Sequence, residues 1–211
     1  MAPMTIETPA ILAGLASKYS DLHRLATRRA SEETAEWLHG RRPVTDRREI
    51  DNARTLARVI PERLTLHEQQ IALHDAVFVP ASEQEIRIVC AAIIGSITHA
   101  SATAGLAFIE SLVFSILHAD DDEYSAWKPR EGFSTPVLYV AARRIIAKSK
   151  FCPAIAEIIE EATLAREMFH RALTATMRLT ELKLAADDLI ELVDDPIIAD
   201  PAGEDEDGIP E

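Results

Sequence analysis

The sequence predicts an all-α protein, on three observations. Apolar residues recur three and four positions apart along nearly the whole chain, which is the spacing of one face of a helix. Alanine, leucine, glutamate and arginine, which favour helices, dominate the composition, and there are only 7 glycines in 211 residues. No stretch shows the alternating pattern of a half-buried strand. The predicted architecture is a small helical domain with a long C-terminal helix packed on N-terminal helices, followed by a disordered acidic tail.

The N-terminal part, residues 1–79, is an arginine-rich helical region. Its first predicted helix covers residues 9–38 and is stopped by Gly40 and Pro43. A second helix begins after Thr45, a residue type that caps helix starts, and ends or kinks at Pro61. A third helix covers residues 64–78.

A central helical domain, residues 80–194, begins after Pro80. Ser82 and Glu85 have the spacing of a capping box, and the segments 86–97 and 106–117 are apolar nearly all round, as buried helices are. Ser134 and Pro136 then give an N-cap and an N1 proline for a helix over residues 137–147. No internal repeat is evident.

Pro153 starts the last predicted helix, which continues without a breaker to Val193, about 40 residues and well beyond the usual globular length. Such a helix needs a partner along its length. The N-terminal helices of the same chain or a second copy of the long helix, in a homodimer, both fit this requirement.

Residues 195–211 complete the predicted organisation as a disordered acidic tail. The net charge of −13 is local, because residues 187–211 hold 11 acidic residues and no basic one, which leaves 24 acids and 22 bases elsewhere. The tail has too little apolar surface to fold. Two roles for it stay open: contact with the chain's own basic residues, or solubility alone.

Targeting and membrane signals are not found in the sequence. The first thirty residues contain Glu7 and Asp21 and show no apolar core behind a basic start, so a cytoplasmic protein is expected. Cys90 and Cys152 have no metal-ligand spacing, which fits a reducing compartment. Residues 88–109 carry no charge, but polar side chains around His99 interrupt them, and we interpret the segment as two buried helices and not as a membrane span.

Known catalytic motifs are absent from the sequence, which predicts a protein that is not an enzyme. The sharpest chemical pattern is a pair of Glu-x-x-His steps, Glu36 to His39 and Glu167 to His170, since di-metal carboxylate bundles use this spacing. Glu110 is the one plausible further ligand. We therefore expect no metal or cofactor, and a ferritin-like metal protein is the less favoured alternative.

A second chemical pattern is the acidic run 120–123, which carries the oxygen ligands that divalent cations prefer. The run has no ordered ligand spacing, so we interpret it as a solvated loop.

Basic residues gather at the end of the 137–147 helix, where Arg143, Arg144, Lys148 and Lys150 form a run without acids. Such a run attracts phosphates or an acidic partner, and it also suits the negative end of a helix dipole. No aromatic residues alternate with these bases, so we expect weak nucleic-acid contact at most.

The same run opens a segment, residues 143–158, that resembles a known element. Its Lys150-Phe151-Cys152-Pro153-Ala154-Ile155-Ala156-Glu157-Ile158 part is similar to the Lys-Phe-x-Pro-x-Ile-x-Glu-Ile element of the phage replicative-helicase loader and inhibitor family. The resemblance covers residues 82–165. Cys152 stands where the family commonly has a second proline, and a long helix follows where the family often becomes flexible.

The resemblance implies a non-enzymatic accessory protein of phage or mobile-element DNA replication that acts by protein contact, with a replicative helicase as the candidate partner. The implied contact residues are Arg143, Arg144, Lys148, Lys150, Phe151 and Pro153. A generic helical adaptor or dimerisation protein is the alternative that the long helix supports.

Overall fold

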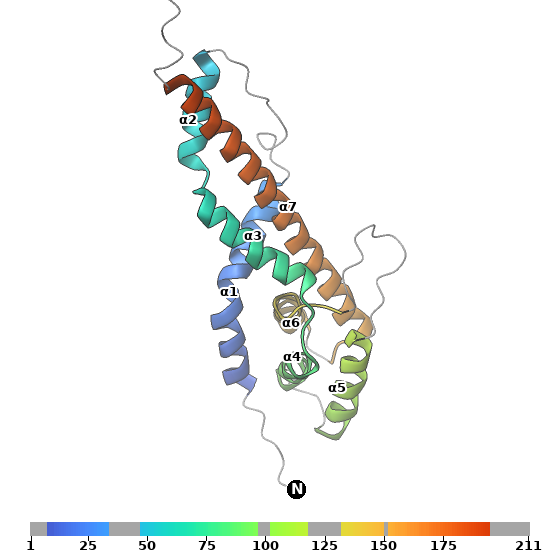
Figure 1. Ribbon diagram of the computed structural model, residues 1–211. Coiled ribbons are helices and arrows are strands. Elements are labelled where there is room, and N and C mark those ends of the chain that lie inside the picture. Colours follow the sequence, from blue (N-terminus) through green and yellow to red (C-terminus); the bar gives the residue numbers. More distant parts are fainter. Residues whose placement is uncertain (1–7, 34–46, 97–101, 118–131, 150–151, 195–211) are drawn as a thin grey trace, which may run out of the picture.

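The computed structural model describes residues 8–33, 47–96, 102–117, 132–149 and 152–194, and within these ranges it contains helices and no strand (Figure 1). The helices are α1 (Thr8–Glu32), α2 (Arg47–Val59), α3 (Arg63–Phe78), α4 (Glu83–Gly95), α5 (Ala102–Leu117), α6 (Thr135–Lys148) and α7 (Ile155–Asp194). The predicted all-α class is confirmed.

Helix α7 is the spine of the molecule. It runs for 40 residues, and α1, α2, α3 and α6 all pack along it (Figure 1). The N-terminal helices therefore supply the partner that so long a helix requires, as predicted.

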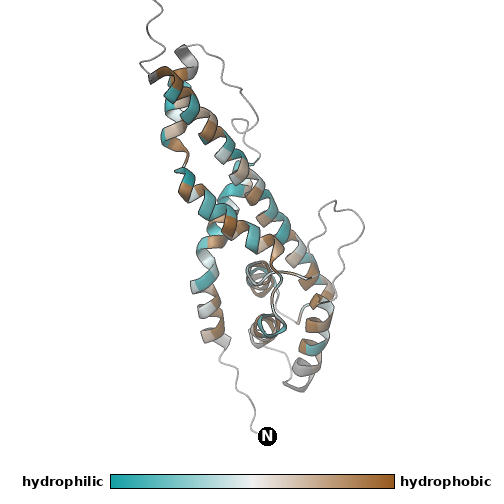
Figure 2. Cartoon of the chain, in the orientation of Figure 1, coloured by the Kyte–Doolittle hydropathy of each residue, from teal (hydrophilic) through white to brown (hydrophobic). Residues whose placement is uncertain are grey.

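The principal core draws on helices from both sides of Pro80. Residues of α1 and α3, such as Ala26 and Leu73, share it with residues of α4, α6 and α7, such as Ile86, Leu138 and Phe169. Helix α5 packs mainly on α4 and is mostly hydrophobic, whereas α3 and α7 have mixed surfaces (Figure 2).

The end of α7 forms a two-helix arm with α2, which packs on α7 and makes no comparable contact with another helix of the described chain. We call α2 and residues 177–194 the arm. Two small clusters hold it together. One contains Ile60, Leu66 and Leu179, and the other contains Ala53, Ala186 and Leu189.

Local signals fix the starts of α4 and α6. The backbone N–H of Glu85 donates to Ser82 Oγ at 3.3 Å and that of Ser82 donates to Glu85 Oε2 at 3.0 Å, so the predicted capping box is confirmed. Ser134 caps α6 by accepting from Val137 N–H at 3.4 Å, and its hydroxyl also donates to the carbonyl of Ala76 on α3. Ser134 therefore both starts α6 and connects α6 to α3.

Helix boundaries differ from the predicted ones by a few residues. Helix α4 begins at Glu83, directly after its predicted cap, but ends at Gly95 and not at 97, and α5 begins at Ala102, earlier than the predicted 106. Residues 34–38 of the predicted first helix, the predicted turn near His99 and the tail 195–211 lie outside the described residues. None of the helices in the described ranges combines the length and the apolar character that crossing a membrane requires.

Candidate functional site at the junction of α6 and α7

Helix α6 carries the basic residues that the sequence singled out. Most of its side chains are buried in the core, so few positions face outward. Arg143 and Lys148 are exposed, and Arg144 is half-buried. The sequence-predicted basic surface is therefore the outer side of an otherwise buried helix.

Two of these bases converge on one acid of the next helix. Lys148 Nζ forms an ion pair with Glu161 Oε1, and Arg144 Nη1 lies 3.7 Å from Glu161 Oε2. The Glu161 side chain is only 13% exposed. Glu161 therefore offsets one of the two positive charges of Arg144 and Lys148. The local sequence does not indicate this pairing, because Glu161 approaches the two bases only when α6 and α7 pack.

Arg143 faces a different neighbour, helix α1. Its guanidinium lies over the Tyr139 ring at 5.8 Å, and Tyr139 in turn packs on Tyr19 of α1 with ring centroids 6.0 Å apart. The described residues offer Arg143 no acid within ion-pair distance. Of the described bases at this junction, Arg143 is thus the one most available to an acidic group from outside.

His23 of α1 belongs to the same surface, although the sequence analysis did not select it. Its pKa lies below the ordinary value because burial disfavours the charged ring and because Arg143 and Arg144 repel it. Thr27, one turn further along α1, donates to the His23 carbonyl at 2.9 Å and approaches the Met168 sulfur, which Arg144 also contacts. Helices α1, α6 and α7 therefore meet here.

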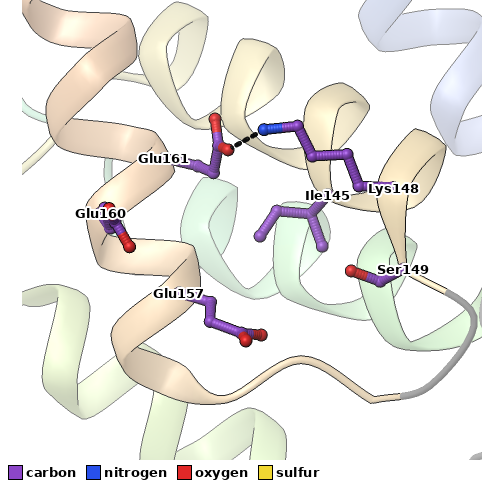
Figure 3. A pocket seen from close by; sticks show the side chains of 6 residues that line it. All are labelled: Ile145, Lys148, Ser149, Glu157, Glu160 and Glu161. Carbon is purple, nitrogen blue, oxygen red and sulfur yellow. Dashed lines mark hydrogen bonds and ion pairs between the residues drawn. The ribbon is translucent and has the colours of Figure 1, made fainter.

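A cavity of about 260 Å³ opens between the end of α6 and the first turns of α7 (Figure 3). Its lining comprises Ile145, Lys148, Ser149, Glu157, Glu160 and Glu161. Three carboxylates face one ammonium group, beside the C-terminal, negative end of the α6 dipole. The cavity suits a cationic or hydrogen-bond-donating group of a partner and disfavours phosphate.

The connection between the two helices leads into α7, which begins at Ile155, two residues after the predicted start at Pro153. Pro153 is buried, Cys152 is exposed, and Glu157 Oε2 accepts the backbone N–H of Ala154 at 3.0 Å. Pro153 therefore holds the connection against the core and is not part of an open surface. Lys150 and Phe151, also predicted to contact a partner, lie outside the described residues.

Neither proposed type of metal site is assembled in the described ranges, where no three His, Cys, Asp or Glu side chains are placed so that they could hold one metal ion. Glu110 forms an ion pair with Arg87 on the surface between α4 and α5 and does not turn inward. The Glu36 to His39 step and the acidic run 120–123 lie outside the described residues.

Comparison of the chain with protein-family models, with curated proteins and with solved structures gives no match.

The lowered pKa of His23 predicts a pH-dependent stability. His23 has its ordinary pKa of 6.5 in the unfolded chain, and in the folded chain its pKa is lower. The stability that the neutral His23 ring allows is therefore fully present above pH 6.5 and is lost as the pH falls below that value. We expect His23→Gln to reduce the loss of unfolding free energy between about pH 7.5 and about pH 5, measured by urea denaturation. Arg143→Gln removes one of the charges that repel the protonated His23, so it should reduce the same loss of unfolding free energy in part. An identical loss in wild type and His23→Gln would contradict the prediction.

Proposed function

We propose that this chain is a non-enzymatic accessory protein of phage or mobile-element DNA replication that acts by contact with a protein partner at the α6–α7 junction. A replicative helicase is the candidate partner. The proposal rests on one observation: the segment that resembles the loader and inhibitor element coincides with a surface cavity whose rim carries both signs of charge over an apolar floor, Ile145.

The chemistry of the junction favours a protein partner over a nucleic acid. Phosphates would meet Glu157 and Glu160 at the cavity, while two of the three described bases already bind Glu161. A protein surface can instead offer a basic side chain to the cavity and an acid to Arg143, a pairing of opposite charges that gives specificity. Polyanions would find only the Arg143 side of the surface.

The proposal can be tested by measuring, with biolayer interferometry, how tightly this chain binds the purified replicative helicase of the cell in which the phage or mobile element replicates. We expect an Arg143→Glu/Lys148→Glu protein to bind at least about tenfold more weakly than wild type, because both charges are inverted at the contact. Arg171→Glu, an exposed change on α7 away from the junction, is the matched control and should bind as wild type does. Absence of binding by the wild type, or equal loss in the control, would argue against a helicase contact at this site.

The Glu161→Gln variant distinguishes a protein partner from a polyanion partner. The change frees Arg144 and Lys148, so affinity for a short oligonucleotide should rise severalfold at low salt. If the wild type already binds the oligonucleotide more tightly than the helicase, the proposed partner is of the wrong class.

A further inference from the structure

Helix α3 carries a two-heptad pattern, too short to be an internal repeat of the chain, that the proposed function does not involve. Its sequence contains two successive heptads, residues 64–70 (LTLHEQQ) and 71–77 (IALHDAV), followed by Phe78. Each heptad has an apolar residue first, histidine fourth and an acid fifth. Residues seven apart lie on nearly the same side of a helix, so each of these positions forms a line along α3.

The pattern gives α3 two apolar faces, and α7 covers only one of them. Leu66 and Leu73 are fully buried, in company with Ala76 and Val77. The stripe of Leu64, Ile71 and Phe78 lies on another side of α3, where Leu64 and Ile71 point outward and Phe78 packs partly against the principal core. Leu64 is 69% exposed and Ile71 is 51% exposed, and Phe78 is half-buried. Helix α3 runs beside α7 in Figure 1, and no labelled helix is drawn over its front side.

Charged and titratable residues flank this stripe in an ordered way. His67 and His74 lie along one side of it, and Glu68 and Asp75 lie along the other, and all four are exposed. His74 contacts the Phe78 ring, with centroids 4.8 Å apart, and Asp75 Oδ1 at 3.5 Å. Each flank is therefore the chemical complement of the other, with the same seven-residue spacing.

We propose that a second copy of this chain binds to the α3 stripe, with the two α3 helices parallel and in register. In a parallel pair related by a twofold axis along the helices, the histidine flank of one copy faces the acidic flank of the other. His67 then meets Glu68 of the second copy, His74 meets Asp75, and each stripe residue meets its own equivalent. An antiparallel pair would place histidine against histidine and acid against acid.

The size of the contact predicts a weak, reversible dimer. Two heptads form an interface below about 1,200 Å² in total, the range of transient complexes. The helix is already formed and fixed on α7, so association carries no cost of folding it. We expect a dissociation constant of about 10 to 100 µM.

Sedimentation equilibrium over a concentration series tests the contact. Wild type should pass from monomer to dimer, and Ile71→Glu should remain monomeric with an unchanged helical circular dichroism spectrum, since Ile71 is half-exposed. Met177→Glu, at an equally exposed position of α7, should dimerise as wild type does. A wild-type monomer at every concentration, or loss of the dimer in Met177→Glu but not in Ile71→Glu, overturns the proposal; the second result would place the dimer contact on the long helix.

Two further variants test orientation and charge pairing. In a Cys152→Ser background, Leu64→Cys should form a disulfide-linked dimer with itself; linkage only to Phe78→Cys would show an antiparallel pair and refute the arrangement. His67→Glu/His74→Glu, with acids on both flanks, should be monomeric alone but should pair with Glu68→Lys/Asp75→Lys in a mixture. Failure of the mixture to pair would contradict the flank complementarity.

Discussion

Leu179→Ala is expected to destabilise the folded chain by about 2 to 5 kcal/mol, the range for truncating a buried leucine. Leu179 is 1% exposed and forms a small cluster with Ile60 and Leu66, which joins the end of α2 and the start of α3 to α7. A cluster this small has few neighbours that can move into the cavity left behind. Chemical denaturation followed by far-ultraviolet circular dichroism measures the loss.

The matched control is Leu184→Ala on the same helix. Leu184 is 39% exposed, so its truncation removes much less buried surface and should cost below about 1 kcal/mol. Equal losses for the two variants would mean that α2 and α3 do not cover the face of α7 on which Leu179 lies.

Lys183→Ala should lower the free energy of unfolding by about 2 to 4 kcal/mol, because it removes a hydrogen bond and the packing of the lysine stem. The carbonyl of Ala57, in the last turn of α2, would normally accept the backbone N–H four residues later, but that residue is Pro61 and has none. Lys183 Nζ donates to this carbonyl at 2.9 Å, and Asp187 Oδ1 lies 3.4 Å from the same ammonium group. Lys183 is 5% exposed, so water cannot replace it readily.

A double-mutant cycle with Pro61→Ala tests this explanation, because the substitution restores a backbone N–H at position 61. Lys183→Ala should then cost about 1 kcal/mol less than in wild type. Arg63→Ala removes an exposed partner of the same Asp187 and should cost less than about 1 kcal/mol. If Pro61→Ala leaves the cost of Lys183→Ala unchanged, the lysine stabilises the arm through its other contacts.

The candidate site was only partly predictable from the sequence. The run from Arg143 to Lys148 and the helix start at Pro153 identify the α6–α7 junction. Glu161 and His23 could not be selected, because nothing near either residue in the sequence indicates that it reaches Arg144 across a helix interface.

The sequence by itself determined the helices of this protein, because the signals that start and stop helices act within a few residues. The capping box at Ser82, the cap at Ser134 and the unbroken apolar periodicity of α7 are all of this kind. Packing of helices far apart in the sequence decided the rest.

Two residues and one helix show what only the tertiary structure decided. Arg29 and Lys183, polar by type, are buried, and each adds to an acid of its own helix a hydrogen bond to another helix, Arg29 to Gln69 and Lys183 to the carbonyl of Ala57. Helix α3 has two apolar faces of similar character, and its periodicity does not distinguish them. Helix α7 covers one face, and Leu64 and Ile71 on the other stay exposed, since one packed helix can bury only one side of its neighbour.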